Sequence, residues 1–312
     1  MRPHIFGTLL VPAALLAGCT ADSIQGPDRS PTASLERRGA RPDPAFTYTV
    51  IEVPGALSTV ASGINARGDV VGTYVDASFR SHGYLLRDGS FTTIDFPGAR
   101  GTDARGIGPN GEVVGGYSRP GEPGVNIHGY LLADGEFTQV DYPGHTNTIP
   151  QRILPKGTIL GCRHDHNTMD TMKGVVIDRE GSSEISAFAS MNNGATPDGS
   201  RIVGLYMNMD AGNRTEGYVI DDGVFTPFLV PNSNFTAGWD MNQAGEIVGV
   251  YRDASGFHGF LRRGDSYFTL HVPGSTATRA IGINARGVVV GSFVAGGKTR
   301  GFVATEERGQ TP

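Results

Sequence analysis

A sixfold internal repeat is the feature that most constrains how this chain of 312 residues can fold. A short turn that ends in glycine recurs along the sequence, and its successive glycines are 43, 46, 42, 46 and 42 residues apart. These glycines are Gly68, Gly111, Gly157, Gly199, Gly245 and Gly287. Such a spacing is typical of one supersecondary unit repeated along a chain. We therefore expect a repeat architecture of units of about 44 residues rather than unrelated domains.

Each unit contains short segments with the composition of β-strands. In the first unit, the turn at 65–68 is followed by a strand at 70–74, a third strand around Gly83, a second turn at 87–89 and a fourth strand at 91–95. Short β-branched and aromatic runs bounded by Gly, Asn and Asp form hairpins, because glycine adopts positive φ without steric cost. Each unit is therefore predicted to be a four-stranded antiparallel sheet.

The two ends of the repeat array are offset from each other. The sixth unit ends at 301–303 without a fourth strand, whereas residues 48–55 match residues 91–98 position for position. An open β-solenoid does not require its two ends to be offset within the repeat. A closed ring does, because a strand from one terminus completes the sheet at the other. We therefore predict an all-β fold, a six-bladed β-propeller over residues 46–304 that is closed by its N-terminal strand. Residues 305–312 are expected to be a disordered tail.

The N-terminus carries an export signal. The apolar run 5–16 is shorter than the roughly 20 residues that a membrane-spanning helix needs. It ends at Leu16-Ala17-Gly18-Cys19, which resembles a lipobox, so we expect residues 1–18 to be removed and Cys19 to carry a lipid. An ordinary secretory peptide cleaved after Ala21 is the alternative.

The residues that follow the signal indicate where the protein resides. Residues 19–45 are rich in Pro, Ser, Arg and Asp and are expected to form a disordered tether behind the lipidated cysteine. Thr20 is not the Asp that usually retains lipoproteins on the inner membrane. By resemblance to lipoprotein sorting rules we expect a lipid anchor in the outer membrane of a Gram-negative bacterium, with simple secretion as the alternative.

The third strand of the repeat resembles that of extracellular repeat proteins of the HAF type, which are named for a His-Ala-Phe step. The step reads His82-Gly83-Tyr84, His128-Gly129-Tyr130 and His258-Gly259-Phe260, and the other three copies depart from it as Lys173-Gly174-Val175, Glu216-Gly217-Tyr218 and Arg300-Gly301-Phe302. The resemblance covers about residues 46–304 and implies an exported β-repeat protein without a defined activity. We interpret the repeated histidines as structural, with metal binding or acid–base chemistry as the alternative.

Charge and motifs exclude several functional classes. The net charge of −5 and the lack of a basic stripe argue against nucleic acid as a partner. Of the two cysteines, Cys19 is expected to carry lipid, which leaves Cys162 without an intrachain disulfide partner. No nucleophile elbow, phosphate loop or HExxH motif occurs, no cofactor is indicated, and we expect a monomer. A hydrolase or lyase assembled from several blades around an axial pocket remains the enzymatic alternative.

A binding face is expected where the loops vary. The turns between first and second strands and between third and fourth strands are uniformly short, whereas the loops between second and third strands vary and should lie on the opposite face. The expected function is an exported, anchored scaffold that binds a protein, glycan or envelope component on this face. Its candidate residues are Phe79, Arg80, Arg119, Glu122, Asp165, Asp170, Asn213, Arg214, Arg252, Asp253 and Lys298.

The loops of the third and fourth units suggest a second kind of site. Thioether and imidazole side chains gather there, as in copper sites. The candidate ligands are His164, His166, Met169, Met172, Met207 and Met209. The alternative is that these loops simply pack through flexible apolar side chains.

Overall fold

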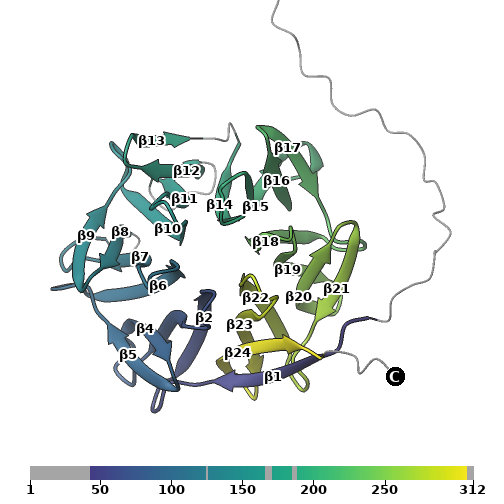
Figure 1. Cartoon of the computed structure of the whole chain (residues 1–312), viewed down its shortest axis with the longest axis horizontal. Coiled ribbons are helices and arrows are strands. Elements are labelled where there is room, and N and C mark those ends of the chain that lie inside the picture. The colour runs from purple at the N-terminus through teal and green to yellow at the C-terminus, as the bar shows by residue number, and fades with distance from the viewer. Residues whose placement is uncertain (1–42, 124–125, 166–170, 185–187, 308–312) are drawn as a thin grey trace, which may run out of the picture. The chain divides into compact units, whose positions relative to one another are not determined.

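The computed structural model describes residues 43–123, 126–165, 171–184 and 188–307. They form six four-stranded antiparallel sheets arranged as blades around a ring (Figure 1). The predicted six-bladed propeller is confirmed. In the described part of the chain, no helix is long and apolar enough to cross a membrane.

The strands follow the repeat in sequence order. Blade 1 is β2 (Ser58–Ile64), β3 (Val70–Val75), β4 (Ser81–Arg87) and β5 (Ser90–Ile94); blade 2 is β6 (Gly101–Ile107), β7 (Val113–Ser118), β8 (His128–Ala133) and β9 (Glu136–Val140). Blade 3 is β10 (Asn147–Ile153), β11 (Ile159–His164), β12 (Lys173–Asp178) and β13 (Gly181–Glu184); blade 4 is β14 (Ser190–Ala195), β15 (Arg201–Asn208), β16 (Arg214–Asp221) and β17 (Val224–Phe228), with the 3-10 helix η2 (Met209–Ala211). Blade 5 is β18 (Phe235–Met241), β19 (Ile247–Asp253), β20 (Gly256–Arg263) and β21 (Ser266–Leu270); blade 6 is β22 (Ala277–Ile283), β23 (Val289–Ala295), β24 (Lys298–Glu306) and β1 (Phe46–Ile51).

The N-terminal strand closes the ring. β1 pairs antiparallel with β24, so the sixth sheet has the order β1-β24-β23-β22. Phe46 lies opposite Glu306, and Ile51 lies opposite Gly301. β24 runs to Glu306, two residues beyond the expected boundary, and the backbone N–H of Glu307 donates to the carbonyl of Ala45. Both ends of the described chain are therefore part of one blade.

The first strands surround the centre of the ring, and glycine allows adjacent blades to pack closely there. In Figure 1, β2, β6, β10, β14, β18 and β22 are the innermost strands. A Cβ atom on Gly83 in β4 would lie 3.2 Å from the Cβ of Ala104 in blade 2. Fully buried Tyr84 packs with Val290 of blade 6, so the core lies between blades rather than within them.

The connections between blades are fixed by a repeated hydrogen bond. In blade 1, Thr59 Oγ1 accepts the backbone N–H of Val53, six residues earlier. The same bond joins Phe96 to Thr102, Tyr142 to Thr148, Val230 to Thr236 and Val272 to Thr278. Each bond links the second residue after a fourth strand to the first strand of the next blade, so it fixes the position of one blade relative to the next.

The ring has two distinct faces. The turn face carries the turns 65–69 and 88–89 and their counterparts in the other blades. The loop face carries the loop 76–80, the connection 95–100 and their counterparts. For blades 5 and 6 the sequence predicts loops at 252–257 and 294–299, but there the second and third strands continue to two-residue turns at 254–255 and 296–297. The loop face is therefore irregular chiefly at blades 1 to 4.

Candidate functional site

The loop of blade 1 presents an aromatic side chain to solvent. Phe79 has a φ of 63°, and 83% of its surface is exposed. The Asp76 carboxylate accepts the backbone N–H groups of Ser78 and Arg80, and the Asp76 carbonyl accepts that of Phe79. Glycine normally occupies the left-handed position of such a loop, because a bulky residue is strained there. The chain therefore holds a phenyl ring at a fixed place on the loop face at a cost to its own stability.

This loop is braced by the first of the repeated histidines. His82 Nδ1 lies 2.8 Å from Asp95 at the end of the fourth strand, and its Nε2 lies 3.2 Å from Asp76. Its ring stacks on Tyr74 with the centroids 5.0 Å apart. The backbone N–H of Arg80 and the His82 ring hold the pKa of Asp76 below its ordinary value. The imidazole therefore fastens the loop to its own blade.

Blade 2 repeats this arrangement. His128 lies 2.8 Å from Asp141 and 2.9 Å from Glu122, and it packs on Tyr117. The hydrogen bond from His128 lowers the pKa of Glu122. Because the two carboxylates contact opposite nitrogens of one ring, they do not converge on a point where a metal could sit. The contacts support the structural interpretation of these histidines.

Blade 5 brings a serine and a histidine together. His258 Nε2 lies 2.8 Å from Ser255 Oγ, but Asp253 lies 3.3 Å from the same nitrogen and 2.6 Å from Ser255 Oγ. In a Ser-His-Asp triad, the aspartate binds the histidine ring nitrogen that does not contact the serine. These contacts brace the two-residue turn at 254–255, and Asp253 is not placed as the acid of a Ser-His-Asp triad.

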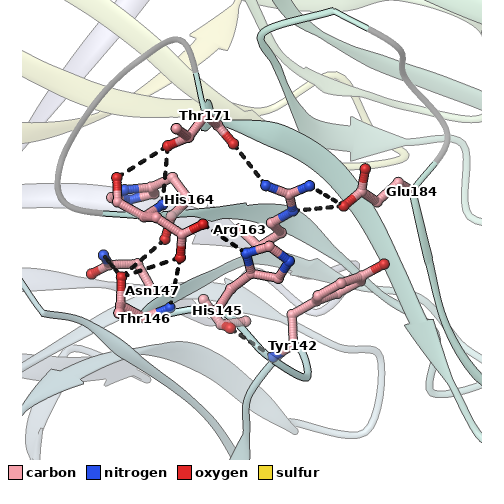
Figure 2. Close-up of polar contacts among 10 residues, drawn as sticks. Tyr142, His145, Thr146, Asn147, Arg163, His164, Thr171 and Glu184 are labelled. Atoms are coloured by element: carbon pink, nitrogen blue, oxygen red, sulfur yellow. Dashed lines mark hydrogen bonds and ion pairs between the residues drawn. The ribbon is translucent and has the colours of Figure 1, made fainter.

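Blade 3 departs most from the repeat on this face (Figure 2). Arg163 lies where four other blades have tyrosine and blade 6 has Phe293. It pairs with Glu184 and donates to the carbonyl of Thr171 at 2.9 Å. His145 Nδ1 lies 2.9 Å from the Asp165 carboxylate, which also accepts the backbone N–H of Thr146. The hydrogen bond from His145 lowers the pKa of Asp165. These bonds join the connection 141–146 to Asp165 at the start of the blade 3 loop, and they join Arg163 of β11 to Thr171 at its end.

The candidate copper ligands are only partly described. His166 and Met169 lie outside the described residues, as does Asp170. His164 is buried, which lowers its pKa, and its Nδ1 has no partner among the described residues. Met172 is 3% exposed and packs with Cys162, whereas Met209 is 66% exposed and Met207 is half-buried. The described residues contain no group of three or more His, Cys, Asp or Glu that could hold a metal ion, and the copper site remains a prediction.

Most of the charged residues expected on the loop face are tied to neighbours. Their contacts are Arg119 with Tyr117 and Gln139, Glu122 with His128, Asp165 with His145, Arg214 with Glu216, Arg252 with Asn234, Asp253 with Ser255, and Lys298 with Glu52. Arg80 donates to the carbonyl of Ala99, and Asn213, with a φ of 62°, is exposed. Among the described candidates, Phe79 is the apolar side chain, and 83% of its surface is exposed.

The turn face contains a hollow on the ring axis, whose lining residues the sequence reasoning did not identify. The axial well, as we call this hollow, has a volume of about 170 Å³. One aliphatic residue from each blade lines it: Ile64, Ile107, Ile153, Ala195, Met241 and Ile283. Its other lining residues are Gly, Asn, Pro, Leu and Ala, together with Arg152 and Asp240.

Arg152 and Asp240 form an ion pair at the axial well. Arg152 Nε lies 3.1 Å from Asp240 Oδ2, and both side chains are buried. Burial raises the pKa of Asp240 above its ordinary value, although Arg152 and the backbone N–H groups of Ile283 and Met241 oppose that shift. The well therefore contains one carboxyl group with a raised pKa, and that group is paired with Arg152. Its lining residues include no hydroxyl, thiol, imidazole or amine, and Asp240 is the carboxylate among them.

The comparisons with known proteins agree with the architecture. No family model and no curated protein matches the chain. Similar solved structures include a putative TolB from Agrobacterium tumefaciens, with 14% identity, a TM-score of 0.54 and coverage of 77% of this chain and 79% of that one. The β-propeller domain of the Trilobed protease from Pyrococcus furiosus has 12% identity, a TM-score of 0.50 and coverage of 81% and 96%. A lectin from Aleuria aurantia in complex with Fucα1-6GlcNAc has 11% identity, a TM-score of 0.51 and coverage of 82% and 97%.

At sequence identities of 11% to 14%, the similarity to these solved structures shows the fold alone. The chain is a β-propeller, and its ligand has to be inferred from its own side chains. One signal in the sequence could have revealed the axial pair. At the repeat position occupied by Gly63 and Gly106 in blades 1 and 2, blades 3 and 5 carry residues of opposite charge, Arg152 and Asp240.

Proposed function

We propose that the protein is an exported, lipid-anchored binding scaffold that holds a protein or glycan of the cell envelope on its loop face. The signal at residues 1–18 and the lipobox cysteine Cys19 support export and anchoring in the outer membrane, with secretion as the alternative. Phe46, the first residue of β1, pairs with Glu306 on the turn face, and this supports the loop face as the binding face. β1 therefore begins on the face opposite the loops.

The proposal rests on the exposure and the backbone conformation of Phe79. An exposed aromatic residue in a strained backbone conformation is costly to the fold, and such strain is concentrated at functional sites. The bonds from Asp76 and His82 fix the loop before any ligand arrives, so little conformational entropy is lost on binding. Rigid aromatic side chains are the usual anchors of binding interfaces. The phenyl ring fits either an apolar pocket of a protein or the apolar face of a sugar ring.

Apolar groups elsewhere on the loop face give a ligand further contacts. Leu57 is exposed and donates its backbone N–H to Val75, next to the Phe79 loop. Phe188 and Met209 are exposed at blade 4, on the other side of the ring. A ligand that spans the loop face would meet apolar side chains at both places. This arrangement favours a macromolecular ligand over a small solute.

The test compares capture by matched variants. Tagged mature protein and its Phe79→Asn and Val224→Asn variants are incubated with envelope extract and with purified cell-wall glycan. Val224 is an exposed apolar residue on the turn face and controls for nonspecific stickiness. We expect a saturable ligand that binds the wild type and Val224→Asn alike and binds Phe79→Asn at least tenfold more weakly. Equal binding by Phe79→Asn, or no saturable ligand from either source, would refute the proposal.

A further inference from the structure

The six first strands carry a β-bulge at the same place, and the residue after it approaches the next blade. In four blades this residue is glycine: Gly63, Gly106, Gly194 and Gly282. A Cβ on Gly63 would lie 2.8 Å from the carbonyl oxygen of Arg105, and one on Gly106 would lie 2.7 Å from that of Gln151. Glycine therefore lets the first strands lie close together at the axis. Only Arg152 and Asp240 place side chains there.

These two side chains close the ring axis beneath the axial well. The Arg152 guanidinium donates to the carbonyl oxygen of Arg105 in blade 2 at 3.0 Å and to that of Ile281 in blade 6 at 2.6 Å. It also contacts Asp240 in blade 5, whose Oδ2 accepts the backbone N–H of Ile283. The pair thus forms a floor that joins four blades. Because the guanidinium and the carboxylate lie 3.1 Å apart, their opposite charges offset each other and the pair presents little net charge to the well.

The walls of the well are apolar although three asparagines line it. Asn65 donates to Asp69, Asn242 donates to Glu246, and Asn284 donates to the carbonyl oxygen of Asn65. Three prolines lie among the other lining residues and supply no N–H group, namely Pro109, Pro155 and Pro197. A charged ligand would lose its hydration without gaining a partner in such a well.

Ala195 provides the space in the well. At its repeat position the other five blades carry isoleucine or methionine, so the wall is recessed only at blade 4. An apolar cavity of about 150 Å³ is large enough to hold benzene, and the volume here is about 170 Å³. The size, the apolar walls and the neutral floor select one class of ligand.

The geometry points to a second binding site in the axial well, for an uncharged apolar ring compound of benzene to indole size that enters from the turn face. This site is independent of the loop-face function, because the two lie on opposite faces of the ring. The ring compound displaces weakly held water from an apolar surface, which is a favourable exchange.

Titration calorimetry and ligand-observed NMR with indole as the probe test the inference. Wild-type mature protein is compared with Ala195→Leu, which fills the recess with a side chain of the size found at the same position in the other blades. We expect saturable indole binding to the wild type and at least tenfold weaker binding to Ala195→Leu, with thermal unfolding showing that the variant is folded. Phe79→Asn serves as the control and is expected to bind indole as the wild type does.

A second experiment varies the charge of the ring compound. Benzoate has the size of a single ring but is anionic, and we expect it to bind at least tenfold more weakly than indole because the floor offers no free cation. No saturable indole binding up to its solubility limit would overturn the inference. Unchanged binding to folded Ala195→Leu, or tighter binding of benzoate than of indole, would also overturn it. Failure of the loop-face proposal would show instead in the Phe79→Asn capture experiment.

Discussion

Ile51 in the N-terminal strand lies opposite Gly301 in the last strand, just as Ile94 lies opposite Gly83 inside the first blade. β1 therefore pairs in the same register as the fourth strand of blade 1, although it comes from the N-terminal end of the chain. Its side chain joins the core between blades 6 and 1, where Ile51 packs with Tyr84 and Val290. Closure of the ring thus depends on burial at this one strand.

The closure can be tested with adjacent residues of β1. Ile51 is 4% exposed and Val50 is 50% exposed. We expect Ile51→Asp to lower the free energy of unfolding by at least about 3 kcal/mol, because it buries an unpaired carboxylate in the core between blades. Val50→Asp, the control, should cost about 1 kcal/mol or less. Urea unfolding followed by near-UV circular dichroism gives both values, and equal losses would contradict closure by a buried strand.

The architecture was predictable because the repeat is local and regular. The turn glycines, the third-strand glycines and the match of residues 48–55 to 91–98 are all visible in the sequence, and together they determine six blades and one closing strand. The loop lengths were not predictable in blades 5 and 6. There the choice between a loop and a continued hairpin depends on pairing along the whole strand, and residues 254–255 and 296–297 fit a two-residue turn only once that pairing exists.

The candidate sites were less predictable than the fold. Phe79 was found from its place in a variable loop, but its strained conformation appears only in the backbone geometry. The contact between Arg152 and Asp240 joins blades 3 and 5, so it follows from the ring and not from sequence neighbours. Several charged loop residues that the sequence suggests as binding groups are bonded to neighbouring side chains, and their role in binding stays a prediction. Sequence alone does not show that Glu122 is bonded to His128 or that Lys298 is bonded to Glu52.

Removing one member of the axial pair should destabilise the ring more than removing both. Arg152→Gly leaves the Asp240 carboxylate buried without its cation, which we expect to cost about 3–5 kcal/mol. The double variant Arg152→Gly/Asp240→Gly restores the glycine of the other four blades and should cost less than either single change. A double-mutant cycle by urea unfolding measures the coupling. Additive losses would contradict a direct interaction between the two side chains.

The axial pair also predicts a pH dependence. Because the folded-state pKa of Asp240 is raised, the folded protein retains this proton at a pH where the unfolded chain has lost it. The contribution of Asp240 to stability should therefore fall as the pH rises from the ordinary aspartate value to the folded-state pKa, and should be constant above it. Carboxyl ¹³C NMR should place the Asp240 midpoint above that of an unperturbed aspartate. A midpoint below the ordinary value would contradict burial as the dominant influence.

The loop of Phe79 allows stability and binding to be separated. Asparagine tolerates the left-handed conformation better than phenylalanine, so Phe79→Asn should raise the free energy of unfolding by about 0.5–1 kcal/mol while it removes the exposed ring. Phe79→Ala removes the ring but keeps a Cβ in the strained conformation, so it should weaken ligand capture equally without the full gain in stability. Thermal unfolding and capture from envelope extract are measured on the same preparations. A variant that is more stable and still binds fully would show that the phenyl ring is not retained for recognition.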